Sequence, residues 1–110
     1  MTTMMTLSLY LNIVVLIPVC VGLISDARWT RAAYGDSTPA RGILLSIYGA
    51  IFVVSVVLVG SGQAAQAVPL LWIQVLYKVT TPLSVGTFRN PVVVTNLCVA
   101  AFHGATLANQ

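Results

Sequence analysis

The segment PLLWIQVLYKVTTP, residues 69–82, is an apolar run that carries one lysine, Lys78, well inside it. Such a run is typical of a helix in a lipid bilayer, where a charged side chain is costly and is normally paired. Lys78 lies about 14 Å along the helix axis if the helix begins near Pro69, or about 21 Å if it begins near Ala64. The first depth places the ammonium near the bilayer centre, whereas the second lets the side chain snorkel to the membrane surface. Both interpretations put the segment in a membrane.

The composition of the whole chain agrees with a membrane location. Of its 110 residues, 58% are hydrophobic and 6% are charged, against about 25% charged residues in soluble domains. The net charge of +3 reflects a shortage of acidic residues, so it does not indicate binding to nucleic acid. No Lys or Arg precedes the first apolar segment, which favours a retained span over a cleavable signal peptide. We expect an integral protein of a prokaryotic plasma membrane.

Four apolar segments are long enough to cross a bilayer or nearly so, at residues 7–24, 40–59, 66–82 and 91–108. Two of them begin with a capping residue followed by proline, Thr38-Pro39 and Asn90-Pro91, which is a helix start signal. Short connections make neighbouring helices antiparallel. The sequence therefore predicts one all-α domain over residues 1–110, an integral membrane bundle of four transmembrane helices.

The basic residues predict how the bundle is oriented. Three arginines lie between the first and second segments, Arg28, Arg31 and Arg41, and Arg89 lies between the third and fourth. Connections rich in Lys and Arg stay on the cytoplasmic side of a membrane. Both termini are therefore expected on the non-cytoplasmic side.

A polar face surrounds Lys78 on the third segment. Its members follow one another at steps of three or four residues and so share one side of a helix: Gln74, Tyr77, Lys78 and Thr81. The carboxylate side chains of the chain, Asp26 and Asp36, both lie in the first connection. A deeply placed Lys78 must therefore meet a carboxylate of another chain, an anionic ligand or lipid, or a cluster of carbonyl groups, or else lose its proton. The face predicts contact with a partner subunit.

Small residues recur every fourth position on two other segments. On the second segment they are Gly42, Ser46 and Ala50, and on the fourth they are Ala100, Gly104 and Ala108. Such stripes let another helix approach closely in a membrane. The approaching helix can belong to the same bundle or to another subunit, and the sequence leaves both open.

His103 is the only histidine, and it shares a face of the fourth segment with Asn96 and Thr106. A histidine in a membrane helix can ligate haem or a chlorophyll-type pigment. The simpler interpretation is a hydrogen bond to another helix or to water at the headgroups. We therefore predict no cofactor and keep His103 as a candidate ligand only.

Catalytic and metal-binding patterns are not found. Cys20 and Cys98 are isolated from each other and from other metal-ligating residues, which excludes a paired-thiol redox motif. Residues 7–24 contain no carboxylate, so proton exchange on an acid in the first helix is excluded as a transport mechanism.

The leading hypothesis is a non-catalytic accessory subunit that forms a hetero-oligomer with other integral membrane subunits and contacts lipids. One alternative is a small homo-oligomeric channel or transporter in which Lys78 selects anions. Another is a cofactor-binding subunit that uses His103.

Overall fold

The structure is a computed structural model and describes residues 2–87 and 89–109. Four long helices dominate it: α1 (Thr2–Ser25), α3 (Pro39–Gly60), α4 (Val68–Val85) and α5 (Pro91–Ala108). A short helix, α2 (Arg28–Tyr34), lies in the first connection, and a 3-10 turn, η1 (Ala64–Ala67), leads into α4. The regular structure of the described residues is entirely helical, which confirms the predicted all-α class.

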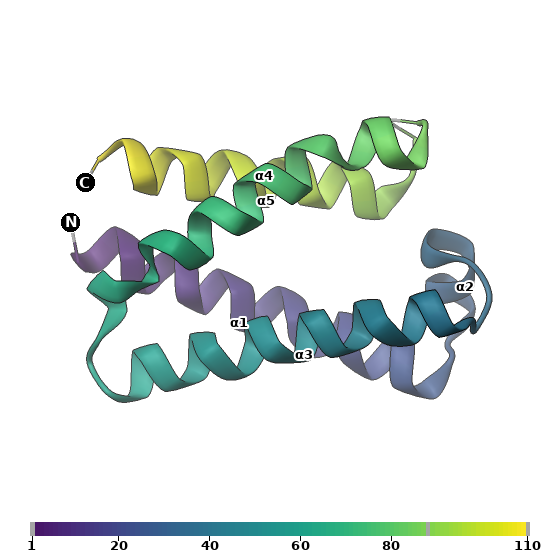
Figure 1. Cartoon of the computed structure of the whole chain (residues 1–110), viewed down its shortest axis with the longest axis horizontal. Coiled ribbons are helices and arrows are strands. Elements are labelled where there is room, and N and C mark those ends of the chain that lie inside the picture. Colours follow the sequence, from purple (N-terminus) through teal and green to yellow (C-terminus); the bar gives the residue numbers. More distant parts are fainter. Residues whose placement is uncertain (1, 88, 110) are drawn as a thin grey trace.

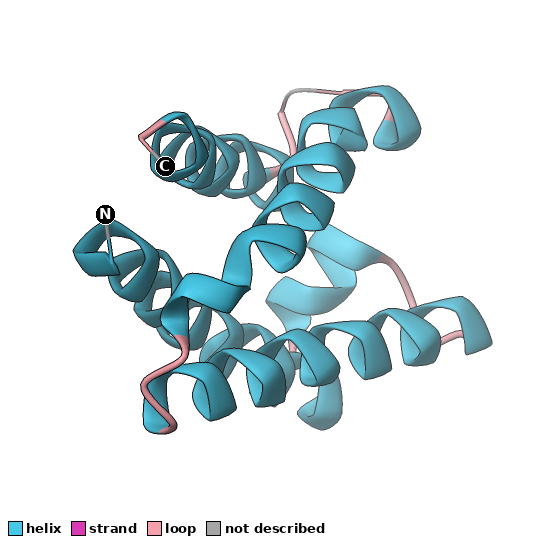
Figure 2. Cartoon of the chain, turned by 60° about the vertical axis from the view of Figure 1, so that its left-hand side comes forward, coloured by secondary structure: helices cyan, strands magenta, loops and turns pink. Residues whose placement is uncertain are grey.

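The four long helices form two hairpins. Helix α1 packs mainly on α3, and α4 packs mainly on α5. Figure 1 shows the two hairpins lying along the same long axis, and Figure 2 shows them seen closer to end-on. Helix α1 also contacts η1 and α5, so it joins one hairpin to the other.

Both chain ends and the turn before η1 lie at one end of the molecule, whereas α2 and the connection from α4 to α5 lie at the other (Figure 1). At the second end the Asn90 side-chain amide donates to the Ala33 carbonyl over 2.7 Å. The connections that carry Arg28, Arg31, Arg41 and Arg89 therefore share one end of the bundle.

The helix starts follow the predicted signals. The Thr38 hydroxyl accepts from the Arg41 backbone N–H at 3.2 Å, and Asn90 Oδ1 accepts from the Val92 N–H at 2.8 Å. Each cap is followed by a proline whose missing N–H costs nothing in the first turn. Both predicted caps are confirmed, and α5 agrees with the predicted range at both ends.

The other boundaries differ from the apolar runs. Helix α1 begins several residues before Leu7, because Met5 is buried against Ala64, Ala67 and Leu71. Helix α4 continues past Pro82 to Val85, where Gly86 ends it with φ of 83°. Proline leaves the Lys78 carbonyl without its helical donor, and the Thr81 hydroxyl replaces that donor at 2.7 Å.

Helix α2 was not expected from the sequence, which shows only a polar connection there. It packs back on α1, where Thr30 is fully buried and its hydroxyl donates to the Ala27 carbonyl at 2.6 Å, close to Gly22 O at 3.2 Å. Gly22 makes this close approach possible, because an added Cβ would clash with the Trp29 ring and lie 2.7 Å from Thr30 Cγ2. The seven-residue helix is held by this contact, by the packing of Tyr34 on the buried cluster that contains Tyr48, and by the ion pair of Arg31 with Asp26.

Within the described part of the chain, three helical stretches are long and apolar enough to cross a membrane: Thr3–Ser25, Pro39–Gly60 and Pro91–Ala108. Helix α4 is not among them, because Gln74, Lys78 and two threonines make it more polar than the other three. The chain is thus a helical membrane protein.

Candidate functional site

Asn12 of α1 is the centre of a buried polar cluster, which comprises Asn12, Ser55, Gln74 and His103. Its Nδ2 donates to Gln74 Oε1 at 2.7 Å and to Ser55 Oγ at 3.2 Å. Its Oδ1 accepts from Gln74 Nε2 at 2.9 Å and lies 2.8 Å from His103 Nε2. An asparagine amide offers two donors and two lone pairs. Asn12 therefore uses its full capacity and links α1 to α3, α4 and α5 at one point.

The same geometry defines the state of His103. Because Asn12 Oδ1 can only accept, His103 Nε2 must carry the hydrogen. The ring is fully buried, and its Nδ1 has no hydrogen-bond partner among the described residues. A haem or pigment at Nε2 would have to displace Asn12, and Nδ1 faces no solvent. These contacts confirm the expected hydrogen bond to another helix.

A second polar contact joins α1 to α5 one helical turn from Asn12. The hydroxyls of Ser8 and Thr106 lie 2.7 Å apart, and both residues are fully buried. In lipid the association of helices gains little from hydrophobic burial, because acyl chains are as apolar as leucine. Hydrogen bonds such as this one and those of Asn12 therefore hold the two hairpins together.

Lys78 lies one turn beyond Gln74 on α4 and is 4% exposed. Its ammonium donates to Asn96 Oδ1 on α5 at 3.2 Å and sits 4.9 Å from the centre of the Tyr77 ring. Both contacts stabilise a cation, but neither supplies a negative charge. The side chain is turned into the bundle and does not extend to a water-exposed end of α4.

The residues of the predicted polar face on α4 differ in exposure. Gln74 and Lys78 point inward and bond to helices of the same chain. Tyr77 and Thr81 are partly buried, and the Tyr77 hydroxyl is buried without a hydrogen-bond partner in the described structure. Two of the four residues of this face, Gln74 and Lys78, therefore bond within the chain. Contact of the face with another subunit stays a prediction.

A cavity of about 380 Å³ lies between the two hairpins at the α2 end. Its walls come from α2, α3, α4 and α5, and its polar members are Tyr34, Tyr48, Tyr77, Thr81, Ser84, Asn90 and Asn96. The Tyr34 and Tyr48 rings meet edge to face with centres 6.1 Å apart. Asn96 and Tyr77 therefore belong both to the cavity wall and to the surroundings of Lys78.

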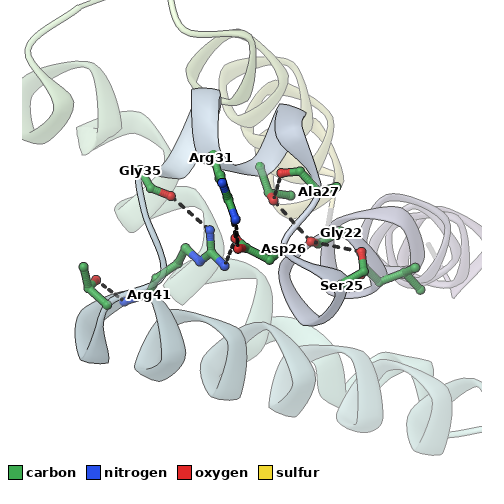
Figure 3. A network of polar contacts seen from close by, with 10 residues as sticks. Gly22, Ser25, Asp26, Ala27, Arg31, Gly35 and Arg41 are labelled. Atoms are coloured by element: carbon green, nitrogen blue, oxygen red, sulfur yellow. Dashed lines mark hydrogen bonds and ion pairs between the residues drawn. The ribbon is translucent and has the colours of Figure 1, made fainter.

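Asp26 organises the loop end of the molecule (Figure 3). Its backbone turns at φ of 54°, directly after α1. One carboxylate oxygen accepts from Arg31 Nε at 3.0 Å and Nη2 at 2.5 Å, and the other accepts from Arg41 Nη2 at 2.7 Å. Arg41 is buried and also donates to the Gly35 carbonyl at 3.0 Å. The ion pair of Asp26 with Arg41 therefore joins the end of α1 to the start of α3.

These ion pairs shift the ionisation of their members. The hydrogen bond from Arg31, and then that from Arg41, lowers the pKa of Asp26 from 3.8 to about 2. The same contact raises the pKa of Arg31. Asp26 thus stays charged to low pH and keeps its hydrogen bonds to Arg31 and Arg41.

The two small-residue stripes lie in different environments. Gly42, Ser46 and Ala50 are all exposed, on the side of α3 away from buried Tyr48 and Ser55. On α5, by contrast, Ala100 is buried, Gly104 is partly buried and Ala108 is exposed. Only the α3 stripe therefore presents a continuous outer face.

The sequence alone identifies Gln74, Lys78, Asn96 and His103 as unusual polar residues. It does not predict that Ser8 and Ser55 take part in the buried hydrogen bonds. The available signal was the spacing of single polar residues within apolar segments. Ser8 and Asn12 are four residues apart, as are Gln74 and Lys78, so each pair shares a helix face. Which faces meet depends on the packing of the hairpins, which the spacing does not contain.

No protein-family model, curated protein or solved structure matches the chain.

Proposed function

We propose that α4 crosses the membrane as a fourth span. The supporting observation is that its polarity is inverted relative to a soluble helix. Gln74 and Lys78 are buried, whereas the outer face carries large apolar side chains, with Ile73 and Leu76 each 60% exposed and Leu83 82% exposed. A soluble helix turns such residues to its core, so this arrangement is typical of a helix that faces lipid.

The proposed orientation follows from the charges. The end that carries the four arginines faces the cytoplasm, and both chain termini face the other side of a prokaryotic plasma membrane. A cysteine at Ala32, in α2, is then expected to react with a membrane-impermeant thiol reagent only after permeabilisation. A cysteine at Gln63, in the opposite turn, is expected to react in intact cells. The reverse pattern would refute this orientation.

Within that topology we propose a non-catalytic accessory subunit of a larger membrane complex. The observation that carries the proposal is the outer face of α3. Gly42, Ser46 and Ala50 are all exposed there, and an added Cβ at Gly42 meets no atom within 4 Å. Small exposed residues at this spacing let the backbone of another membrane helix come close. The buried amides of Asn12 and Gln74 are meanwhile occupied by contacts within the chain, which leaves α3 as the favoured docking helix.

The test is purification from the native membrane in mild detergent, followed by native mass spectrometry. The accessory role predicts larger membrane subunits in fixed ratio with the chain. Ala50→Trp, on the stripe, is expected to release them, whereas Ala101→Trp is the matched control, because Ala101 is exposed on the outer side of α5. Release by both variants or by neither would argue against the α3 face.

The second candidate is a small homo-oligomeric channel or transporter for anions. It is favoured by the row of buried polar side chains that runs from Ser8 through Asn12 to Lys78, next to the cavity. Four helices are few to enclose a pathway, so this role requires more than one copy. Purification would then yield a homo-oligomer without other chains, and liposomes containing it would conduct anions.

A further inference from the structure

We propose that the cavity between the hairpins is a binding site for a small aromatic monocarboxylate, with Lys78 as its charge partner. This inference concerns a site within a single chain and does not depend on the accessory role. Three features of the molecule support it: the position of the ammonium, the character of the cavity walls and the charge around the cavity.

The ammonium lies directly behind the cavity wall. Asn96, which lines the cavity, accepts from Lys78 Nζ at 3.2 Å, and Tyr77, which also lines it, has its ring centre 4.9 Å from the same nitrogen. A lysine has three donors, and Asn96 takes one of them. Rotation of the Asn96 amide would open a direct route from the cavity to Nζ. A carboxylate at the inner end of the cavity could then accept from the ammonium.

An anion is the ligand that this lysine lacks. Charges in a low-dielectric interior are stable only when paired and hydrogen-bonded, and Lys78 has an amide oxygen and an aromatic ring but no carboxylate among the described residues. Hydrogen bonds between an ammonium and a carboxylate are about twice as strong as neutral ones. A bound monocarboxylate would therefore pair with the ammonium of Lys78, and no unpaired charge would remain in the interior.

The walls fit a flat apolar body. Tyr34, Tyr48 and Tyr77 come from three different helices, and Leu44, Val85 and Val93 are among the aliphatic residues of the lining. Tyrosine rings already in edge-to-face contact favour a further aromatic ring. A volume of about 380 Å³ also lies within the usual range of small-molecule sites, roughly 300–1,000 Å³.

The cavity lies at the basic end of the molecule, the end of α2 in Figure 1. Ala33, Ser84 and Asn90 are among its lining residues, next to the connections that contain four arginines and two aspartates. An excess of positive charge at a site entrance raises the local concentration of anions. The charge around the cavity thus agrees with the sign of the proposed ligand.

The test uses the full chain in nanodiscs of zwitterionic lipid, with 4-fluorobenzoate as the probe and ¹⁹F NMR titration as the measurement. The neutral analogue 4-fluorobenzyl alcohol reports partition into the lipid. We expect saturable binding of the carboxylate that is tighter than that of the alcohol. Lys78→Met is expected to weaken carboxylate binding about tenfold or more, as loss of a charged hydrogen bond would, and to leave the alcohol unaffected.

A second pair of variants leaves Lys78 in place. Ala33→Phe fills the cavity and is expected to abolish binding, whereas Ala32→Phe is the matched control on the exposed side of α2. Equal affinity of the wild type for acid and alcohol would overturn the proposal. Unchanged binding in both Lys78→Met and Ala33→Phe, or no saturable binding by the wild type at millimolar probe, would overturn it as well.

Discussion

Asn12 and Gln74 exchange two hydrogen bonds across the interior of the bundle, with Nδ2 to Oε1 at 2.7 Å and Nε2 to Oδ1 at 2.9 Å. The two residues belong to different hairpins, so this reciprocal amide pair joins them directly. Ser55 and His103 complete the coordination of the same asparagine. One side chain of α1 therefore contacts all three of the other long helices.

Asn12→Leu is expected to lower the free energy of unfolding by about 2 kcal/mol, since four hydrogen bonds are lost and each contributes about 0.6 kcal/mol in a membrane bundle. Unfolding in mixed micelles with increasing SDS measures the change. Thr95→Val is the control, because Thr95 is exposed and bonds only to its own helix. Equal stability of the Asn12→Leu variant and the wild type would show that the cluster does not hold the hairpins together.

Lys78 and Asn96 are expected to respond unequally to substitution. Asn96→Leu leaves the buried ammonium without its amide acceptor, whereas Lys78→Met removes the charge and keeps the bulk of the side chain. Asn96→Leu should therefore lower the free energy of unfolding more than Lys78→Met does, by about 1 kcal/mol or more. The same SDS unfolding experiment compares them, together with the double variant, which should be more stable than Asn96→Leu alone. A larger loss in Lys78→Met would contradict this account of the pair.

Gly22→Ala tests how α2 is attached to α1. The added methyl would clash with the Trp29 ring and with Thr30, and overpacking of this kind costs about 1–3 kcal/mol. Alanine is more favourable than glycine in a helix by up to about 1 kcal/mol. We therefore expect the free energy of unfolding to fall by about 1 kcal/mol. Gly49→Ala is the matched control, because its new Cβ meets no atom within 4 Å, and it should be neutral or stabilising. A gain in stability from both substitutions would argue against close packing of α2.

Acid is expected to weaken the loop end of the bundle through Asp26. Because the pKa of this carboxyl is lowered from 3.8 to about 2, its ion pairs stabilise the folded state above about pH 4 and are lost as the pH falls towards 2. The melting temperature of the wild type should therefore decrease over that interval, and that of Asp26→Asn should decrease less. Asp36→Asn is the comparison and should retain the wild-type decrease. Parallel curves for the wild type and Asp26→Asn would contradict the prediction.

The sequence predicted the helices well because capping and hydrophobicity are local properties. Asn90-Pro91 placed the start of α5, and Thr38-Pro39 placed that of α3. Helix α4 continues through Pro82 because the Thr81 hydroxyl bonds to the Lys78 carbonyl. A hydropathy pattern does not contain this hydrogen bond. Helix α2 escaped prediction because long-range contacts hold it in place, with Gly22 of α1 and with Tyr48 of α3, and the sequence pattern does not contain them.

The candidate site was predicted only in part. The unusual residues were identified, since Lys78 and His103 stand out in apolar segments. Their partners depend on which helix faces meet, and that is a long-range property of the two hairpins. An internal amide acceptor for Lys78, Asn96, was therefore not foreseen, although both residues were already considered.

The central claim is that α4 lies in the membrane with its polar residues inward. Spin labels at Ile73, Leu76 and Gln63 of a cysteine-free background test it directly, by power saturation with oxygen and with a water-soluble nickel complex. The account predicts high oxygen and low nickel accessibility at residues 73 and 76, and high nickel accessibility at Gln63 in the turn. High nickel accessibility at residues 73 and 76 would place α4 outside the lipid and contradict the account.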